Sequence, residues 1–180
     1  MKRSTIIFAS VVATVVMLTT TMNVNAQTSE VPGDSKALRL GIGFNAGLPL
    51  DDAYDLALGG DIRLQKDFTS NISATLSAGY TNFSFKDGLE LPDGTTSISY
   101  IPVKAGVKVF PIEKFYVSAE AGAAFATEEG VGTSLVYAPG IGYAFNNGLD
   151  LGVRYEGFYR NEVNLGQVAL RIAYGFNLSK

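Results

Sequence analysis

Apolar side chains occupy every second position along most of this chain. Between Leu38 and Leu178 the alternation runs through eight segments, with polar or small residues at the positions between. The segments are 38–50, 58–68, 72–80, 99–110, 115–126, 134–145, 149–159 and 167–178. A period of two residues is typical of β-strands that have one apolar face and one polar face. The pattern therefore predicts an all-β protein with eight strands.

The links between these segments differ in length. The short links are 69–71, 111–114 and 146–148, and Asn147-Gly148 in the last of them favours a tight hairpin turn. The longer or more polar links are 49–57, 82–98, 127–133 and 160–166. Because short and long links alternate strictly, an antiparallel up-and-down meander would collect all short turns and both chain ends at one end.

The polar faces of these strands are rich in glycine. The glycines at polar-face positions are Gly41, Gly43, Gly47, Gly79, Gly106, Gly122, Gly140, Gly142, Gly152 and Gly175. A water-facing surface would need bulky polar residues there, whereas small residues on the concave side of a narrow barrel leave room for long charged side chains. Eight strands enclose a space that side chains just fill. We therefore expect the polar face inside and the apolar face outside.

Aromatic residues gather near both ends of the apolar faces. The group at the short-turn end is Phe68, Phe115, Tyr143, Phe145, Tyr174 and Phe176. The group at the long-loop end is Tyr80, Phe125, Tyr137, Tyr155 and Tyr159. Two aromatic rings around an aliphatic belt are typical of a barrel that crosses a bilayer, where closure pairs every backbone group. The predicted fold is an eight-stranded antiparallel up-and-down transmembrane β-barrel.

Three stretches carry a resemblance to a known family. Residues 99–110 (SYIPVKAGVKVF), residues 139–145 (PGIGYAF) and Tyr174-Gly175-Phe176 resemble the fourth strand, the sixth strand and the last-strand insertion signal of small outer-membrane β-barrels. This porin-like family of Gram-negative bacteria includes the OmpA transmembrane domain and OmpX. The resemblance covers residues 38–178 and implies an outer-membrane location and recognition by the insertion machinery. Residues 177–180 are a departure, because such signals usually end on the aromatic residue.

The N-terminal region resembles a secretory signal peptide. Lys2 and Arg3 precede an apolar core, and Val24-Asn25-Ala26 offers small residues for cleavage before Gln27. A membrane-anchoring helix is the alternative, although the apolar core is shorter than the roughly 20 residues that span a bilayer. The predicted organisation is a signal peptide over 1–26, a short periplasmic segment over 27–37 and the barrel over 38–178.

Ten charged residues are predicted to face the interior. They are Arg39, Asp61, Arg63, Lys104, Lys108, Glu120, Asp150, Arg154, Glu156 and Arg171, with a net charge of +2. Either they line a selective ion path, or they pair with one another and fill the lumen. We expect the paired arrangement. In it, Lys104 and Lys108 find acids such as Glu120 on the next strand, and Arg154 and Arg171 find Glu156, Asp150 or Asp61.

The predicted role is structural or in surface interaction, with a largely plugged lumen; a narrow channel for ions or small solutes is the alternative. The chain has no Cys and no His, and no Ser–Lys pair stands out, so we expect no enzyme, no metal site and no cofactor. The net charge of −3 disfavours nucleic acid. Expected partners are outer-membrane lipid and lipopolysaccharide, and the protein is expected to be a monomer. A soluble lipocalin-type barrel is a third possibility.

The predicted long loops are acidic. Their acidic residues are Asp51, Asp52 and Asp55 in the first loop, Asp87, Glu90 and Asp93 in the second, and Glu128 and Glu129 in the third. A Ca²⁺ or Mg²⁺ ion bridging lipopolysaccharide phosphates would need such oxygen ligands. Their spacing matches no ordered cation loop, so we expect solvated loops.

Two irregularities remain within the strands. Pro102 and Pro139 lie at interior positions and cannot donate a hydrogen bond, so each predicts a bulge or an unpaired carbonyl. The apolar period also changes parity after Tyr80, because Phe83 and Phe85 fall on the other face. A bulge, or departure of the chain from the membrane, would explain this change.

Overall fold

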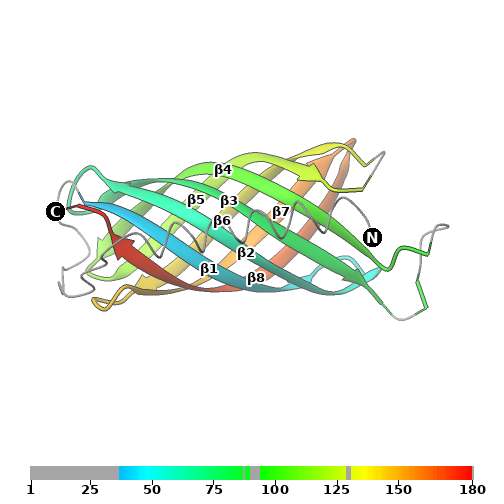
Figure 1. Cartoon of the computed structure of the whole chain (residues 1–180), viewed down its shortest axis with the longest axis horizontal. Helices are drawn as coiled ribbons and strands as arrows, with labels where there is room; N and C mark the ends of the chain where they lie inside the picture. Colours follow the sequence, from blue (N-terminus) through cyan, green and yellow to red (C-terminus); the bar gives the residue numbers. More distant parts are fainter. Residues whose placement is uncertain (1–36, 87, 90–93, 129–130, 180) are drawn as a thin grey trace.

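The computed structural model describes residues 37–179 except 87, 90–93 and 129–130. The predicted signal peptide and residues 27–36 lie outside the described part. The strands are β1 Leu38–Pro49, β2 Tyr54–Asp67, β3 Ile72–Phe85, β4 Ser97–Ile112, β5 Phe115–Ala126, β6 Thr133–Ala144, β7 Leu149–Arg160 and β8 Val163–Asn177. Each strand pairs antiparallel with its neighbours in the chain, and β1 pairs with β8. The predicted eight-stranded up-and-down barrel is confirmed (Figure 1).

The barrel closes along the seam between β1 and β8. Ile42 lies opposite Tyr174, and Phe44 lies opposite Ile172. The tail after the last strand lengthens the seam, because the Leu178 N–H donates to the Leu38 carbonyl at 2.7 Å and the Leu38 N–H donates to Ser179 Oγ at 2.7 Å. Residues 178 and 179 therefore continue the edge contact that β8 begins. Within the described residues, no helix is long and apolar enough to cross a membrane.

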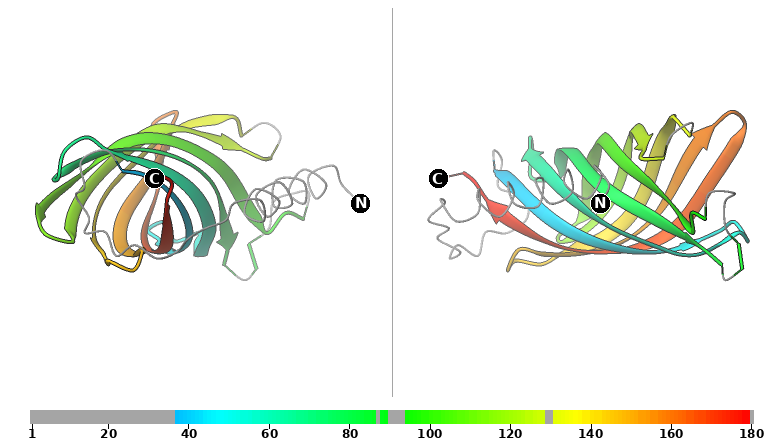
Figure 2. Two further views of the ribbon diagram at one scale, coloured as in Figure 1. Left: turned by 60° about the vertical axis from the view of Figure 1, so that its left-hand side comes forward. Right: turned by 45° about the vertical axis from the view of Figure 1, so that its right-hand side comes forward.

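The two ends of the barrel differ less in loop length than the sequence predicts. The start of β1, the end of β8 and the links 68–71, 113–114 and 145–148 share one end (Figure 2). The opposite end carries 50–53, 86–96, 127–132 and 161–162. The strict alternation of short and long links is therefore wrong, since the first and last of these are tight turns.

The reason for this error is that β2 and β8 begin earlier than predicted. Residues 54–57 pair with β3, and residues 163–166 pair with β7. Asn161 and Glu162 form a two-residue turn with φ values of 48° and 67°, as tight hairpins require. Residues 160–166 are mostly polar or glycine, so the alternation of apolar and polar positions is not visible there. The first part of β8 is therefore predicted as a link.

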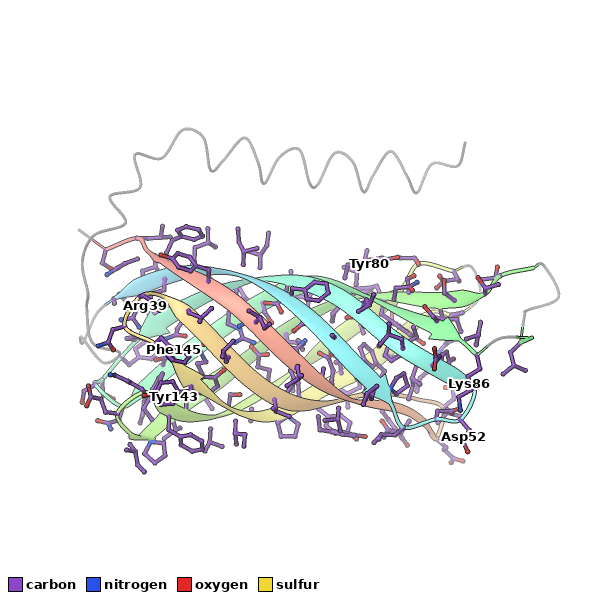
Figure 3. All side chains as sticks on the ribbon, turned by 90° about the horizontal axis from the view of Figure 1, so that it is seen from below. Arg39, Asp52, Tyr80, Lys86, Tyr143 and Phe145 are labelled. Atoms are coloured by element: carbon purple, nitrogen blue, oxygen red, sulfur yellow. The ribbon has the colours of Figure 1, made fainter. Side chains whose placement is uncertain are left out.

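The apolar face of each strand points outward. Large side chains such as Phe44, Leu76 and Leu170 are 55 %, 55 % and 61 % exposed on the barrel surface, whereas the polar side chains opposite them are buried. The aromatic residues predicted for the two rings lie on exposed or half-buried positions at the two ends. Figure 3 places Tyr143 and Phe145 toward the end that carries Arg39, and Tyr80 toward the end that carries Asp52 and Lys86. Their contact with a bilayer interface stays a prediction.

Both prolines interrupt one ladder without shifting the register. Pairing of β3 with β4 stops after Ala78–Val103 and resumes in the same register at Thr81–Tyr100. The same two-pair gap separates Tyr137–Gly157 from Gly140–Arg154 beside Pro139. Of the two predicted alternatives, the bulge is wrong at both sites, and the local break in pairing agrees with the other, an unpaired carbonyl. Register shifts lie elsewhere, between Tyr54 and Leu56 and between Val109 and Ile112.

A bulge does not explain the change of apolar period after Tyr80. Phe83 is fully buried, on the same inward face as Ser73, Ser77 and Thr81, so β3 keeps one parity to its end. At the level of Phe83 the interior of the barrel changes from polar to apolar. The aromatic residue that looked displaced belongs to a second, apolar layer inside the barrel.

A gel assay tests the closed barrel. Unboiled protein should migrate on an SDS gel at a different position from boiled protein, because closure leaves no unpaired edge from which detergent can open the ladder. Circular dichroism should report β structure with little helix. Identical migration, a helical spectrum or full extraction from membranes by carbonate would contradict a membrane-inserted barrel.

Candidate functional site: the charged interior of the barrel

The interior of the barrel holds long charged side chains over small neighbours. Strand alternation turns all ten predicted residues inward, and most of them are buried. A Cβ atom on Gly43 would lie 2.8 Å from Nη2 of Arg171, and one on Gly142 would lie 2.3 Å from the Tyr116 ring. The glycines of the polar face therefore provide the room that these long side chains occupy.

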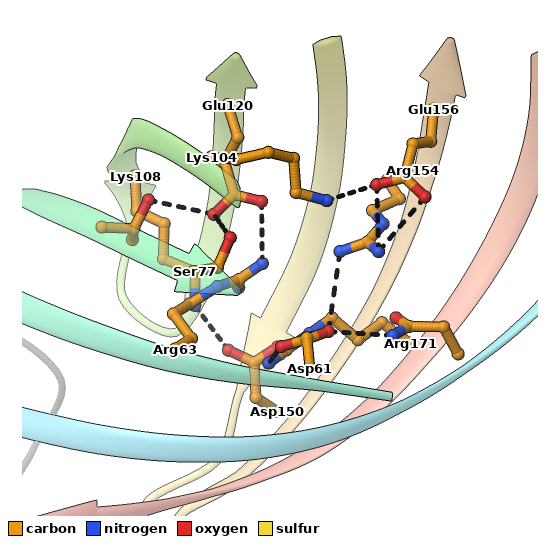
Figure 4. A network of polar contacts seen from close by, with 12 residues as sticks. Asp61, Arg63, Ser77, Lys104, Lys108, Glu120, Asp150, Arg154, Glu156 and Arg171 are labelled. Atoms are coloured by element: carbon orange, nitrogen blue, oxygen red, sulfur yellow. Dashed lines mark hydrogen bonds and ion pairs between the residues drawn. The ribbon is translucent and has the colours of Figure 1, made fainter. Parts of the chain in front are cut away.

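Asp61 on β2 is the centre of one group of contacts. Arg171 on β8 donates from Nη2 to Oδ1 at 2.7 Å and from Nε to Oδ2 at 3.0 Å, which is the two-pronged geometry of strong Arg–carboxylate pairs. Asn45 Nδ2 donates to Oδ2 at 2.9 Å, and Arg154 Nη1 lies 3.8 Å from the same oxygen. Side chains from β1, β7 and β8 thus meet on the Asp61 carboxylate, and Figure 4 shows those of Arg154 and Arg171 beside it.

Glu156 on β7 is the centre of a second group. Lys104 reaches it from β4 and pairs with Oε1, which lies 3.3 Å from Arg154 Nη2. Gln167 Nε2 donates to Oε2 at 2.9 Å. The carboxylate is completely buried, so two cations and one amide take the place of its hydration shell.

Glu120 and Asp150 hold the remaining cations. Glu120 Oε2 accepts from Arg63 at 3.0 Å, and its Oε1 accepts from Thr75 Oγ1 at 3.1 Å. Asp150 accepts from Lys108 at 2.5 Å and from the Tyr116 hydroxyl at 2.6 Å. All ten predicted residues therefore take part in ion pairs.

Arg154 contacts Glu156 and Asp61, and Arg171 contacts Asp61 and Asp150, as expected. The expected partner of Lys104 and Lys108 on the next strand is wrong. Lys104 and Lys108 cross the barrel to Glu156 and Asp150 on β7, and Glu120 pairs with Arg63 on β2. Cross-strand geometry explains this, since glycines rather than charges lie directly opposite on the neighbouring strands: Gly122 opposite Lys104, and Gly106 opposite Glu120. Long side chains in a narrow lumen extend across it.

Asp67 is a network member that sequence reasoning missed. It pairs with Arg39 at 2.6 Å and accepts from Ser73 Oγ at 2.5 Å and Gln65 Nε2 at 2.9 Å. Asp67 lies on the same face of β2 as Asp61, Arg63 and Gln65, and this alternation is the signal that could have found it. With Asp67, the interior holds six basic and five acidic groups, so its net charge is +1 rather than +2.

An apolar layer, also missed, closes the interior above the ion pairs. Phe83, Tyr100 and Phe158 pack with ring centroids 4.9 to 6.1 Å apart, which is the usual range for aromatic pairs. The buried residues of this apolar layer are Ala57, Phe83, Tyr100, Ala124, Val136, Phe158 and Leu165. The layer lies toward the end that carries loop 86–96, and the inward parity of its aromatic residues is the signal that predicts it.

Carboxylates in the described part of the acidic loops accept hydrogen bonds from backbone N–H groups. Asp51 Oδ1 accepts from the Ala53 N–H at 2.9 Å, and Glu128 Oε1 accepts from the Ser99 N–H at 3.0 Å. The described residues contain no group of three or more His, Cys, Asp or Glu side chains able to hold a metal ion. Asp87, Glu90, Asp93 and Glu129 lie outside the described residues.

A closed eight-stranded barrel with an apolar outer surface and a charged interior defines the class of transmembrane β-barrels. Residues 12–176 match the family described as "Outer membrane protein beta-barrel domain". The chain belongs to this family, and its location is the outer membrane. A comparison with curated protein sequences finds no significant match.

Solved structures share this fold at low sequence identity. Ail of Yersinia pestis is 20 % identical with a TM-score of 0.57, over 79 % of this chain and 100 % of Ail. The N-terminal barrel of Pseudomonas aeruginosa OprF is 16 % identical with a TM-score of 0.54, over 80 % and 99 % of the two chains. The de novo designed barrel TMB2.3 is 15 % identical with a TM-score of 0.51, over 81 % and 98 %.

Proposed function

We propose that this protein is an integral outer-membrane barrel with a structural or surface-interaction role, and that its lumen is closed to ions. The observation that carries the proposal is the pairing of every inward charge in the network, with the apolar layer above it. An ion that passed through the network would have to break existing ion pairs, and an apolar constriction opposes the entry of water. The network and the layer would block conduction by different physical means.

The size of one cavity in the interior supports a closed lumen. A cavity lined by Arg63, Glu120, Arg154 and Arg171 measures about 10 Å³, which is about the room that one water molecule needs. A hydrated ion needs more space than this. We assign no catalytic role, because the chain lacks His and Cys.

Conductance in a planar bilayer tests the closed lumen. Purified protein should show no steady current above baseline, because transport would require both ion-pair rupture and wetting of the apolar layer. Steady, ion-selective currents whose selectivity is reversed by Lys104→Glu would contradict the proposal and establish the narrow channel instead.

The outward face of β3 and β4 supports a surface role. Above Tyr80 the outward positions become polar: Tyr80 Oη and Asn82 Nδ2 donate to Ser99 Oγ at 2.8 and 2.9 Å. A polar outer face suits water rather than lipid. We propose that these strand ends and loop 86–96 stand outside the cell as a site for surface partners.

Protease treatment of intact cells tests this orientation. Cleavage, where it occurs, should fall within residues 82–98, the region that contains the longest link between strands. Cleavage mapped to the 145–148 turn would place the opposite end outside and contradict the proposed topology.

Further proposals concern partners and assembly. The exposed apolar belt fits outer-membrane lipid and lipopolysaccharide acyl chains, and the C-terminal strand with Tyr174 and Phe176 fits the insertion machinery. Closure of the barrel leaves no open sheet edge for a second copy to extend. We therefore propose a monomer, and size-exclusion chromatography with light scattering would detect a dimer.

A further inference from the structure

Two arginines in the middle of the lumen have more donors than acceptors. Arg63 donates one hydrogen bond to Glu120, and its Nε atom has no partner among the described residues. Arg154 contacts Glu156 through Nη2. Its Nη1 lies 3.8 Å from Asp61 Oδ2, beyond hydrogen-bond distance, and neither Nη1 nor Nε has a hydrogen-bond partner among the described residues. Both residues are only 7 % exposed. Buried guanidinium N–H groups without acceptors are costly, so such donors indicate a missing acceptor.

These donors belong to residues that line one cavity. The cavity of about 10 Å³ lies inside the barrel, and Arg63, Arg154 and Arg171 contribute to its wall. Figure 4 shows Arg63 and Arg154 reaching into the lumen from β2 and β7. The carboxylate that lines the cavity, Glu120, already accepts from Arg63 through Oε2 and from Thr75 through Oε1. The wall therefore presents mainly positive charge and N–H donors.

The charges that line the cavity point in the same direction. Three arginines and one carboxylate, that of Glu120, contribute to its wall, so the charge at the wall is positive. A water molecule at the cavity would satisfy donors but would leave this charge unbalanced. A monovalent anion would satisfy both requirements, because buried charges are stable when paired and hydrogen-bonded.

We propose that the cavity between Arg63 and Arg154 is a binding site for a single small monovalent anion of the chloride class. The small volume excludes sulfate, phosphate and carboxylate ligands. The site lies inside the ion-pair network and needs no conduction, so it is independent of whether the lumen is open or closed. Its ligand would act as a structural part of the network.

Unfolding in urea at constant ionic strength tests the site. Sodium gluconate is replaced stepwise by sodium chloride, and the midpoint is measured for wild type, Arg63→Gln, Arg154→Gln and Arg39→Gln. Binding to the folded state lowers the equilibrium constant of unfolding by a factor of 1 + [Cl⁻]/Kd, which is about elevenfold when the chloride concentration is ten times Kd. The midpoint should rise and saturate for wild type and for Arg39→Gln, which removes an interior charge outside the cavity. It should be independent of chloride for the other two variants.

Equal chloride dependence of the midpoint in all four proteins would reflect a general salt effect and would overturn the proposed site. A midpoint of wild type that does not depend on chloride would also overturn it. Crystals of wild-type protein grown in bromide provide a test that needs no variant to fold. An anomalous peak between Arg63 and Arg154 is expected. Density there without anomalous signal would identify a water molecule and overturn the proposal. Conductance measurements do not bear on either result.

Discussion

Replacement of Glu156 by glutamine should lower the free energy of unfolding by about 3 kcal/mol, the low end of the cost of stranding a buried charge. Glu156 is completely buried and is the ion-pair partner of both Lys104 and Arg154. Glutamine keeps the volume of the side chain but removes the charge that compensates these cations. Urea unfolding in detergent micelles measures the change.

A matched control separates this effect from any Glu-to-Gln change. Glu113 lies exposed in the tight link between β4 and β5, so Glu113→Gln should change stability by less than about 0.5 kcal/mol. Adding Lys104→Met to Glu156→Gln should recover part of the loss, because it removes one of the stranded charges. If Glu156→Gln costs no more than Glu113→Gln, water in the lumen solvates the network and the paired arrangement adds no stability.

Replacement of Phe83 by alanine should cost about 3–5 kcal/mol, the range for large-to-small changes in packed cores. Phe83 is fully buried, and its ring packs edge-on against Tyr54, Tyr100 and Phe158 at centroid distances of 5.8, 6.1 and 5.4 Å. Its removal leaves a cavity that the rigid barrel wall cannot collapse to fill. The same urea experiment measures the loss.

Phe125→Ala is the control for the aromatic change. Phe125 points outward and is 47 % exposed, so lipid or detergent fills the space that the ring leaves. Phe83→Ala should therefore cost more, and the difference reports the cavity. Equal costs would mean that the apolar layer is loosely packed. Conductance of Phe83→Ala should stay at baseline, because the ion pairs below the layer remain intact.

These two residues represent two different ways of filling one lumen. The lower part contains charges whose partners come from across the barrel, such as Lys108 and Asp150 at 2.5 Å. The upper part contains aromatic rings and small apolar residues. The proposed closure therefore does not depend on a single salt bridge, and loss of one component should reduce stability before it opens a path.

The alternation of side chains by itself determined the class of fold and the direction of each face. A period of two residues assigns every side chain to one of two faces, and the glycines on the charged face identify it as the concave one. Arg39, Lys104 and Arg171 could be placed inside for this reason. The resemblance of residues 99–110 to an outer-membrane strand led to the correct family.

Parity also contained signals that other features obscured. Asp67 and Phe83 have the inward parity of their strands, yet one stands beside a turn and the other interrupts a run of polar residues. The early starts of β2 and β8 were hidden in the same way, because exposed positions there carry polar residues such as Asp55 and Asn164. Local composition outweighed periodicity in each of these interpretations.

Only the tertiary structure decided which charges meet. The alternation along each strand shows that Lys104, Glu120 and Glu156 share the interior. Which of these residues form an ion pair depends on the diameter of the barrel, the tilt of the strands and their register, and these are fixed only when β1 pairs with β8. Neighbouring strands place glycines opposite Lys104 and Glu120, so both side chains reach past the next strand to β7 and β2. The physical reason is that the pattern of one strand specifies whether a side chain points inward or outward. The distance between two side chains across a closed barrel depends on all eight strands together.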